Sequence, residues 1–164
     1  METNIILAGV GGQGILSISV VIDLAALRHG WHFKQAEVHG MSQRGGLVTS
    51  DIRFGQRVWS PMVPPGEADY LVLLAPSEME AVQGALKPDG LVLGTEIVAA
   101  EDLPNRRSLN VALLGALSVH LAIPMEHLLD AMRAALPEKL HHTNEEAFAI
   151  GRERAARMVH TTEA

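Results

Sequence analysis

The chain contains no cysteine in its 164 residues. This absence excludes a disulfide framework, a thiolate nucleophile, and any zinc or iron–sulfur centre held by cysteines. If the protein takes part in electron transfer, the metal centres therefore belong to a partner.

Long apolar runs and an excess of basic residues are also absent. No run approaches the roughly 20 residues that cross a bilayer, and the acidic start Met-Glu-Thr-Asn predicts no signal peptide. The net charge of −6, without a basic stripe, disfavours nucleic acid as a partner. We therefore expect a cytoplasmic protein with no membrane and no nucleic-acid contact. Its length and its 48% hydrophobic content suit one globular domain, residues 1–164.

A glycine-rich turn follows the apolar run Ile5-Ile6-Leu7-Ala8. Residues 9–14 read Gly-Val-Gly-Gly-Gln-Gly, a G-x-G-x-x-G pattern that also includes Gly12 and Gln13. In this setting Gly9 makes a tight turn, Gly11 admits a phosphate to bare backbone, and Gly14 lets helix and strand pack closely. The pattern predicts nucleotide binding, and close packing alone remains the alternative. Glu37 stands at about the distance at which dinucleotide-binding proteins place a ribose ligand, but it also opens a second motif.

That second motif spans residues 37–46 and reads Glu-Val-His-Gly-Met-Ser-Gln-Arg-Gly-Gly. A loop this rich in glycine and polar side chains, between two strands, is where ligand and partner contacts concentrate. Arg44 offers a planar fork for a carboxylate or phosphate. Ser42 and His39 lack a third orienting group, so we assign no catalytic residue and no metal ligand. The candidate contact residues are Gly9, Gly11, Gly12, Gln13, Gly14, Glu37, His39, Ser42, Gln43, Arg44, Gly45 and Gly46.

Hydrophobic periodicity predicts strands that alternate with helices. The expected strands are Asn4–Ala8, His32–Val38, Leu47–Phe54, Tyr70–Ala75 and Leu91–Gly94. The expected helices are Gly14–His29, Ser77–Leu86, Val111–Ala122, Met125–Leu136 and Glu145–Val159, with Ser77, Asn110 and either Thr143 or Asn144 as N-caps. We also expect a hairpin from Leu47–Phe54 through Gly55-Gln56 into Val58–Ser60, a turn at residues 87–90, and no defined element over residues 95–109. The pattern predicts a three-layer, Rossmann-like α/β domain with a parallel or mixed sheet and helices on both faces.

The two motifs together resemble the gamma subunit or gamma domain of the 2-oxoacid (pyruvate/ketoisovalerate):ferredoxin oxidoreductases, and most of all the beta subunit of the indolepyruvate enzymes. Three later segments extend the resemblance over nearly the whole chain. They are Ser60-Pro61 with Pro65–Asp69, which is similar to "SP…GxAD", the segment Asn110–Ala116 that is similar to "NxxxLGA", and Asn144–Gly151 that is similar to "NxxAFxxG". Ala75-Pro76-Ser77-Glu78 is similar to the family's "EPxE", with alanine in place of the first glutamate. The chain is shorter than expected for the family between Gly94 and Asn110.

The resemblance implies an oxidoreductase subunit that is inactive alone. The family's complexes oxidise indolepyruvate, pyruvate or related 2-oxoacids to acyl-coenzyme A with thiamine diphosphate, magnesium and iron–sulfur clusters, and they reduce ferredoxin. This chain lacks the G-D-G…N segment that binds thiamine diphosphate, so a catalytic partner subunit is expected to hold these groups and this chain none.

We hypothesise that the glycine turn and the residue 39–46 loop meet at the carboxyl ends of the strands, at the topological switch point. There they would form one wall of a cleft for the substrate or the coenzyme A phosphates. Three alternatives stay open. The loop could form only a subunit interface, the chain could be a stand-alone NAD(P)- or nucleotide-binding protein, or it could be a homologue that has lost its partner.

Overall fold

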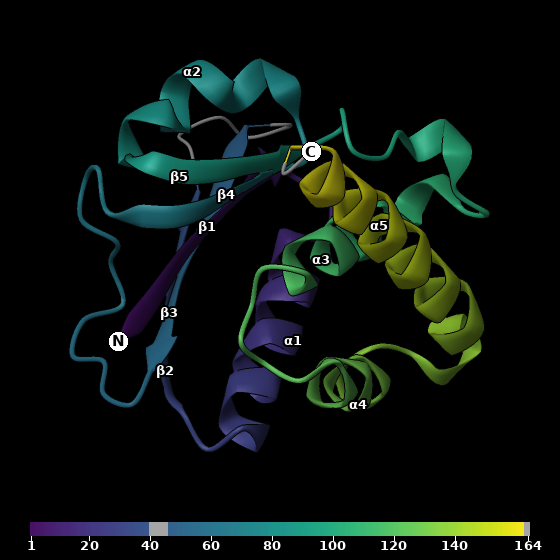
Figure 1. Ribbon diagram of the computed structural model, residues 1–164, viewed down its shortest axis with the longest axis horizontal. Helices are drawn as coiled ribbons and strands as arrows, with labels where there is room; N and C mark the ends of the chain where they lie inside the picture. The colour runs from purple at the N-terminus through teal and green to yellow at the C-terminus, as the bar shows by residue number, and fades with distance from the viewer. Residues whose placement is uncertain (40–45, 163–164) are drawn as a thin grey trace.

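The computed structural model describes residues 1–39 and 46–162 and contains one five-stranded mixed sheet (Figure 1). Its strands are β1 (Glu2–Val10), β2 (His32–His39), β3 (Leu47–Gly55), β4 (Ala68–Leu73) and β5 (Leu86–Gly94), in the order β2-β3-β1-β4-β5. β4 is parallel to β1 and β5, whereas β3 is antiparallel to β1 and β2. The carboxyl ends of β1, β2, β4 and β5 therefore share one edge of the sheet, which confirms the predicted mixed α/β class.

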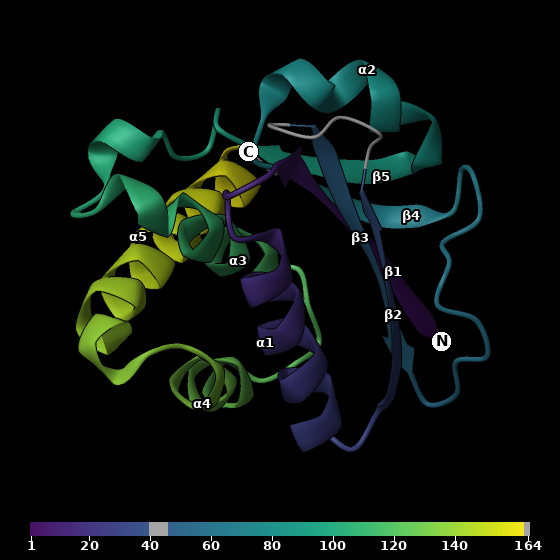
Figure 2. The same ribbon diagram turned by 180° about the vertical axis from the view of Figure 1, so that it is seen from behind.

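Helices cover both faces of the sheet (Figures 1 and 2). α1 (Ile15–Arg28) and α3 (Leu109–Ser118) pack on one face, α4 (Met125–Ala135) packs on α1, and α5 (His141–Thr162) packs on α3. The short α2 (Met79–Val82) covers the other face. Successive side chains of β1 point to opposite faces of the sheet, so β1 contributes to the apolar core on both faces. Ile5 and Leu7 pack on the α1 side, and Ile6 and Ala8 pack on the α2 side. None of the described helices is long and apolar enough to cross a membrane.

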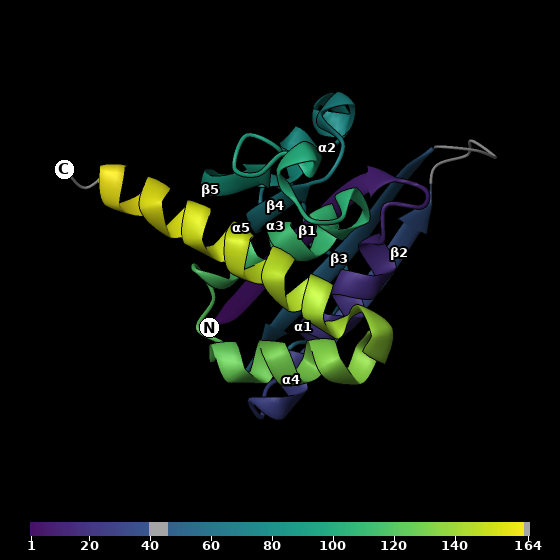
Figure 3. The same ribbon diagram turned by 90° about the vertical axis from the view of Figure 1, so that its right-hand side faces the viewer.

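Two glycines allow α3 and α5 to cross at close range (Figure 3). A Cβ atom on Gly151 would lie 1.7 Å from the carbonyl oxygen of Ala112, and one on Gly115 would lie 2.1 Å from that of Phe148. Both obstacles are backbone atoms, which cannot rotate away. The crossing therefore requires glycine at both positions.

We predict that Gly151→Ala destabilises the fold. Alanine normally stabilises a helix relative to glycine by about 1 kcal/mol. A lower free energy of unfolding in this variant would therefore come from the clash, and overpacking of this kind typically costs about 1–3 kcal/mol. Urea unfolding measures the change, and Gly84→Ala is the control because a Cβ there meets nothing within 4 Å. A neutral or stabilising Gly151→Ala would contradict the close crossing.

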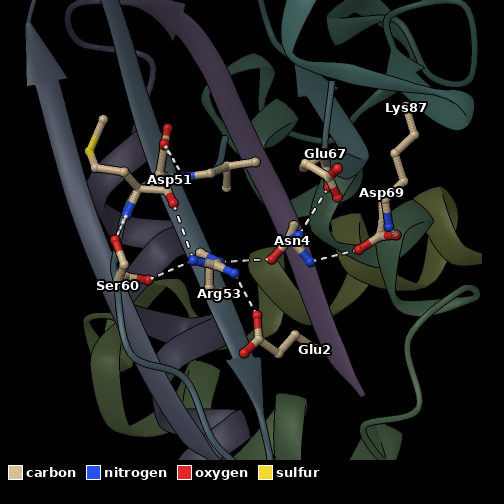
Figure 4. Close-up of polar contacts among 10 residues, drawn as sticks. Glu2, Asn4, Asp51, Arg53, Ser60, Glu67, Asp69 and Lys87 are labelled. Carbon is tan, nitrogen blue, oxygen red and sulfur yellow. Dashed lines mark hydrogen bonds and ion pairs between the residues drawn. The ribbon is translucent and has the colours of Figure 1, made fainter. Parts of the chain in front are cut away.

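A polar network closes the edge of the sheet opposite the glycine turn (Figure 4). The Arg53 guanidinium donates to Asn4, to Glu2, and to the carbonyl oxygens of Ser60 and Met62. Asn4 donates its side-chain amide to the Glu67 carbonyl and its backbone N–H to Asp69, which also pairs with Lys87. The network ties β1, β3 and β4 to the connection after β3.

Asp23 is a buried carboxyl group on α1. It is 6% exposed, and its Oδ1 atom has no hydrogen-bond partner among the described residues. Burial raises the pKa of this carboxyl from 3.8 to about 7.

We predict that Asp23 makes the protein less stable as the pH rises. Because its pKa is higher in the folded chain than in the unfolded chain, the folded state holds a proton between pH 4 and 7 that the unfolded state has lost. Stability should therefore fall across this window by at most roughly 1.4 kcal/mol per pH unit. Asp23→Asn should flatten the slope and raise the melting temperature at pH 8, whereas Asp89→Asn, at an exposed site, should do neither. An unchanged slope in Asp23→Asn would refute the assignment.

Two local expectations around β3 and β5 are wrong. Residues 58–60 form no strand, because β1 and β2 already occupy both edges of β3 and Arg53 binds the carbonyls of the connection. Residues 87–90 lie within β5 and not in a turn between elements. They form an irregularity in the register, since Ala68 pairs with Leu86 while Tyr70 pairs with Leu91.

Three predicted N-caps are also wrong. The Ser77 hydroxyl bonds Glu78, and its segment divides into η1 (Pro76–Glu78), α2 and η2 (Gln83–Ala85). Gly84 contributes to this break because its carbonyl accepts the N–H of Gly66 instead of continuing the helix. Asn110 lies inside α3, which ends at Ser118 and not at Ala122. Thr143 and Asn144 lie inside α5, which begins at His141 after η5 (Glu138–Leu140).

Candidate functional site

The glycine turn connects β1 to α1 at the carboxyl edge of the sheet. Gly12 and Gly14 have positive φ angles of 87° and 79°, which side chains other than glycine rarely adopt. Gly9 lies within β1 and not in the turn, and a Cβ there would approach Gln13 Oε1 to 2.6 Å. The predicted tight-turn role of Gly9 is therefore wrong, and its role is close packing. Gly11 is exposed, and a Cβ there would meet nothing within 4 Å.

Two side-chain amides hold the turn in place. Gln13 Oε1 accepts the N–H of Val10 at 2.8 Å, and Gln13 Nε2 donates to the Leu74 carbonyl, just beyond β4, at 3.3 Å. Asn110 Nδ2 donates to the Gly14 carbonyl at 3.2 Å. The turn is thereby tied both to the adjacent parallel strand and to the start of α3.

The topological switch point lies between β1 and β4. From β1 the chain crosses to β2 through α1 on one face, and from β4 it crosses to β5 through α2 on the other. A hollow of about 490 Å³ opens there, which we call the switch-point crevice. It is lined by Gly12, Gln13, Leu74, Ala100, Arg106, Arg107 and Leu109. Ligands of open α/β sheets bind in crevices at this position.

A second, smaller hollow of about 180 Å³ lies on the other side of the turn. Gly11, Gly12 and Gly14 border it together with Glu37 and His39 at the end of β2. His39 Nε2 lies 2.8 Å from Glu37 Oε1. The structure thus brings both motifs together, but Glu37 and His39 lie on the β2 side of β1, away from the switch point. Gly46 immediately precedes β3, and Ser42, Gln43, Arg44 and Gly45 lie outside the described residues.

Sequence reasoning missed Arg106 and Arg107. Both lie in η4 (Arg106–Ser108), within the stretch for which no element was predicted. Asn105 Oδ1 accepts the N–H of Arg107 at 3.0 Å, and the Ser108 hydroxyl bonds Asn144 in α5. Two consecutive arginines just ahead of Asn110 were the available signal, but only the fold places them beside the glycine turn.

Among residues 1–39 and 46–162, no group of three or more histidine, aspartate or glutamate side chains could hold a metal ion. The glycine turn borders both hollows, and Arg106 and Arg107 place positive charge beside the larger one.

An α/β domain with a glycine turn at the switch point of its sheet has a Rossmann-like architecture. The chain belongs to the pyruvate ferredoxin/flavodoxin oxidoreductase family, whose profile matches residues 4–104. It is 33% identical to indolepyruvate oxidoreductase subunit IorB of Thermococcus kodakarensis over 198 aligned positions, which cover 96% of this chain and 98% of that protein. The IorB subunit of Methanothermobacter thermautotrophicus is 31% identical, with 92% and 96% covered.

Solved structures share the fold. The keto/oxoacid ferredoxin oxidoreductase gamma subunit of Geobacter sulfurreducens superposes with a TM-score of 0.80 at 22% identity, covering 96% of this chain and 98% of that one. The 2-oxoglutarate:ferredoxin oxidoreductase of Magnetococcus marinus, solved with 2-oxoglutarate, coenzyme A and succinyl-CoA, superposes with a TM-score of 0.79 at 21% identity. This chain covers 31% of that longer one, and 95% of this chain is matched. These likenesses confirm the three-layer fold.

We predict that two glycines of the turn respond differently to alanine. Gly14→Ala should lower the melting temperature, because Gly14 has a positive φ and a Cβ there would lie 2.3 Å from Asn110 Nδ2. Gly11→Ala should leave the melting temperature within about 1 °C, because the space is open. If a ligand contacts this backbone, Gly11→Ala should nevertheless weaken its binding about ten-fold or more. A strongly destabilised Gly11→Ala would contradict the open geometry.

Proposed function

We propose that this chain is the subunit without redox centres of a 2-oxoacid:ferredoxin oxidoreductase complex. One observation carries the proposal: an open glycine turn at the switch point of a cysteine-free chain that resembles indolepyruvate oxidoreductase subunits over nearly their whole length. The reaction is the oxidative decarboxylation of a 2-oxoacid to its acyl-coenzyme A. Indolepyruvate or a related aryl 2-oxoacid is the proposed substrate, because the relatives named for it match at 31–33% identity.

The chemistry of the redox step belongs to a partner subunit. Iron–sulfur clusters need cysteine thiolates, which this chain lacks. Thiamine diphosphate binds through magnesium, and no set of residues for a metal ion is found in the described part of the chain. We therefore assign thiamine diphosphate, magnesium and the clusters to the catalytic partner, which passes electrons to ferredoxin in the cytoplasm.

The proposed contribution of this chain is one wall of the cleft. Gly11 and Gly12 expose backbone at the amino end of α1, where N–H groups and the helix dipole favour an anion. His39 and Glu37 border the same turn. Ser42, Gln43 and Arg44, with Gly45 and Gly46, follow directly in the chain and are the proposed contacts to the substrate carboxylate or to the coenzyme A phosphates.

These groups bind and orient without taking part in bond making. Coenzyme A, when bound, supplies the thiol that accepts the acyl group. The protein's own role is to hold its phosphates against fixed N–H donors and an arginine fork. Rigid support from Gln13 and Asn110 keeps those donors in place before the ligand arrives.

Anaerobic reconstitution with the catalytic subunit tests this function. Viologen reduction by indolepyruvate and coenzyme A should require this chain, and Arg44→Ala should lower kcat/KM about ten-fold or more because a charge-assisted contact is lost. Arg28→Ala, an exposed arginine at the opposite end of α1, is the matched control and should change nothing. Full turnover without this chain would overturn the proposed function, and full turnover with Arg44→Ala would remove Arg44 from the site.

A further inference from the structure

The outer face of α1 is apolar along most of its length. Leu16, Val20 and Leu27 are 50%, 38% and 57% exposed, and Leu24 between them is half-buried. Their spacing of three or four residues places these side chains on one face of the helix, over a length of roughly 16 Å. We call these four residues the α1 stripe. Isolated exposed hydrophobic residues are ordinary on a protein surface, but a continuous row of them marks an interaction surface.

No charged side chain interrupts the α1 stripe. α1 contains two charged residues, of which Asp23 is buried and Arg28 follows the stripe, turned about 100° around the helix from Leu27. The inner face of α1 packs on the sheet, and α4 covers one flank (Figure 2). α1 is therefore apolar on both its inner and its outer face. Helices of this composition are normally buried in a larger structure, yet the outer face of α1 is exposed in the chain alone.

One end of the α1 stripe lies at the proposed cleft. Leu16 borders the smaller hollow together with Gly12, Glu37 and His39. A subunit that supplies the opposite wall of this cleft reaches the glycine turn, and from there the stripe continues the same surface along α1. This continuity indicates that one partner covers both the cleft wall and the stripe.

The size of the α1 stripe argues against a second copy of this chain as its occupant. A stable interface takes about 20–30 residues from each side, and two copies of a four-residue stripe supply far fewer. A catalytic subunit that also contacts the cleft wall adds the stripe to a larger interface. In the Magnetococcus marinus enzyme the matched domain makes up 31% of a longer chain and is joined to the remainder covalently. A separate subunit has to hold its partner through surface contacts instead.

We propose that the α1 stripe is the docking surface for the catalytic partner subunit, which covers it with an apolar surface of its own. This inference rests on the proposed function for the existence of that partner. An apolar centre that excludes water, beside a more polar rim, is the usual anatomy of a protein interface. Because α1 begins at the glycine turn, docking along α1 also fixes the turn against the opposite wall of the cleft.

Dissociation of the complex on dilution tests the docking surface. The complex is purified through a tag on this chain after co-expression with the catalytic subunit, and its dissociation is followed by mass photometry. Val20→Lys/Leu27→Lys should raise the dissociation constant about 100-fold or more, because the interface would bury unpaired charges. Met158→Lys, at a similarly exposed helix position in α5, is the matched control and should leave it unchanged.

The fold of the variant chain is measured separately. The melting temperature of the full chain should stay within about 2 °C in the double lysine variant, because both positions are exposed and lysine is a good helix former. If the lysines lower the melting temperature further, Val20→Ala/Leu27→Ala decides the question. Alanine keeps the helix and removes the apolar contacts, so this variant should raise the dissociation constant about ten-fold.

The outcomes separate the docking surface from the proposed function. An unchanged dissociation constant in both double variants would overturn the docking surface alone. A complex that required the α1 stripe but oxidised no 2-oxoacid would overturn the proposed function and leave the docking surface standing. An unmodified chain that captured no catalytic subunit would overturn both.

Sedimentation equilibrium of the chain alone tests the second copy as occupant. The unmodified chain and the double lysine variant should have the same mass, because the α1 stripe is reserved for the catalytic subunit. A dimer that the lysines convert to a monomer would assign the stripe to a second copy and overturn the proposal.

Discussion

The carboxyl edge of this protein depends on one interaction, the hydrogen bond from the Asn110 amide to the Gly14 carbonyl. Gly14 has a left-handed backbone conformation, and the Asn110 side chain occupies the space a Cβ would need. Through this contact the start of α3 fixes the start of α1, and Gln13 fixes the same turn to β4. Because η4 leads directly into α3, the bond also sets where the arginines stand relative to the glycine turn.

The strand order of the mixed sheet places one hollow on each side of the glycine turn. β3 runs against its neighbours and separates β2 from β1, so Glu37 and His39 approach the turn from one side. β4 runs parallel to β1 and opens the switch-point crevice on the other. Gly12 borders both hollows.

The sequence predicts the layers, the glycine turn and the family, because buried strands and amphipathic helices leave periodic patterns. It wrongly predicts N-caps at Asn110 and Asn144, which lie inside α3 and α5. Both residues are strong N-cap formers by local rules, yet tertiary contacts engage their amides, with Gly14 in one case and Ser108 in the other. Sequence reasoning does not identify Arg106 and Arg107 as site residues for a related reason. The local sequence does not distinguish an arginine that borders a crevice from one on an open surface.

The proposed cleft is complete only when the catalytic partner subunit supplies its other wall. The proposed function therefore requires that this chain assemble with such a subunit. Anaerobic affinity purification of this chain from its native host, followed by mass spectrometry of the bound proteins, tests it most directly. The account predicts recovery of a larger subunit that carries cysteine clusters and a thiamine diphosphate motif, in constant ratio to this chain. Recovery of the chain alone, or with unrelated proteins, would contradict it.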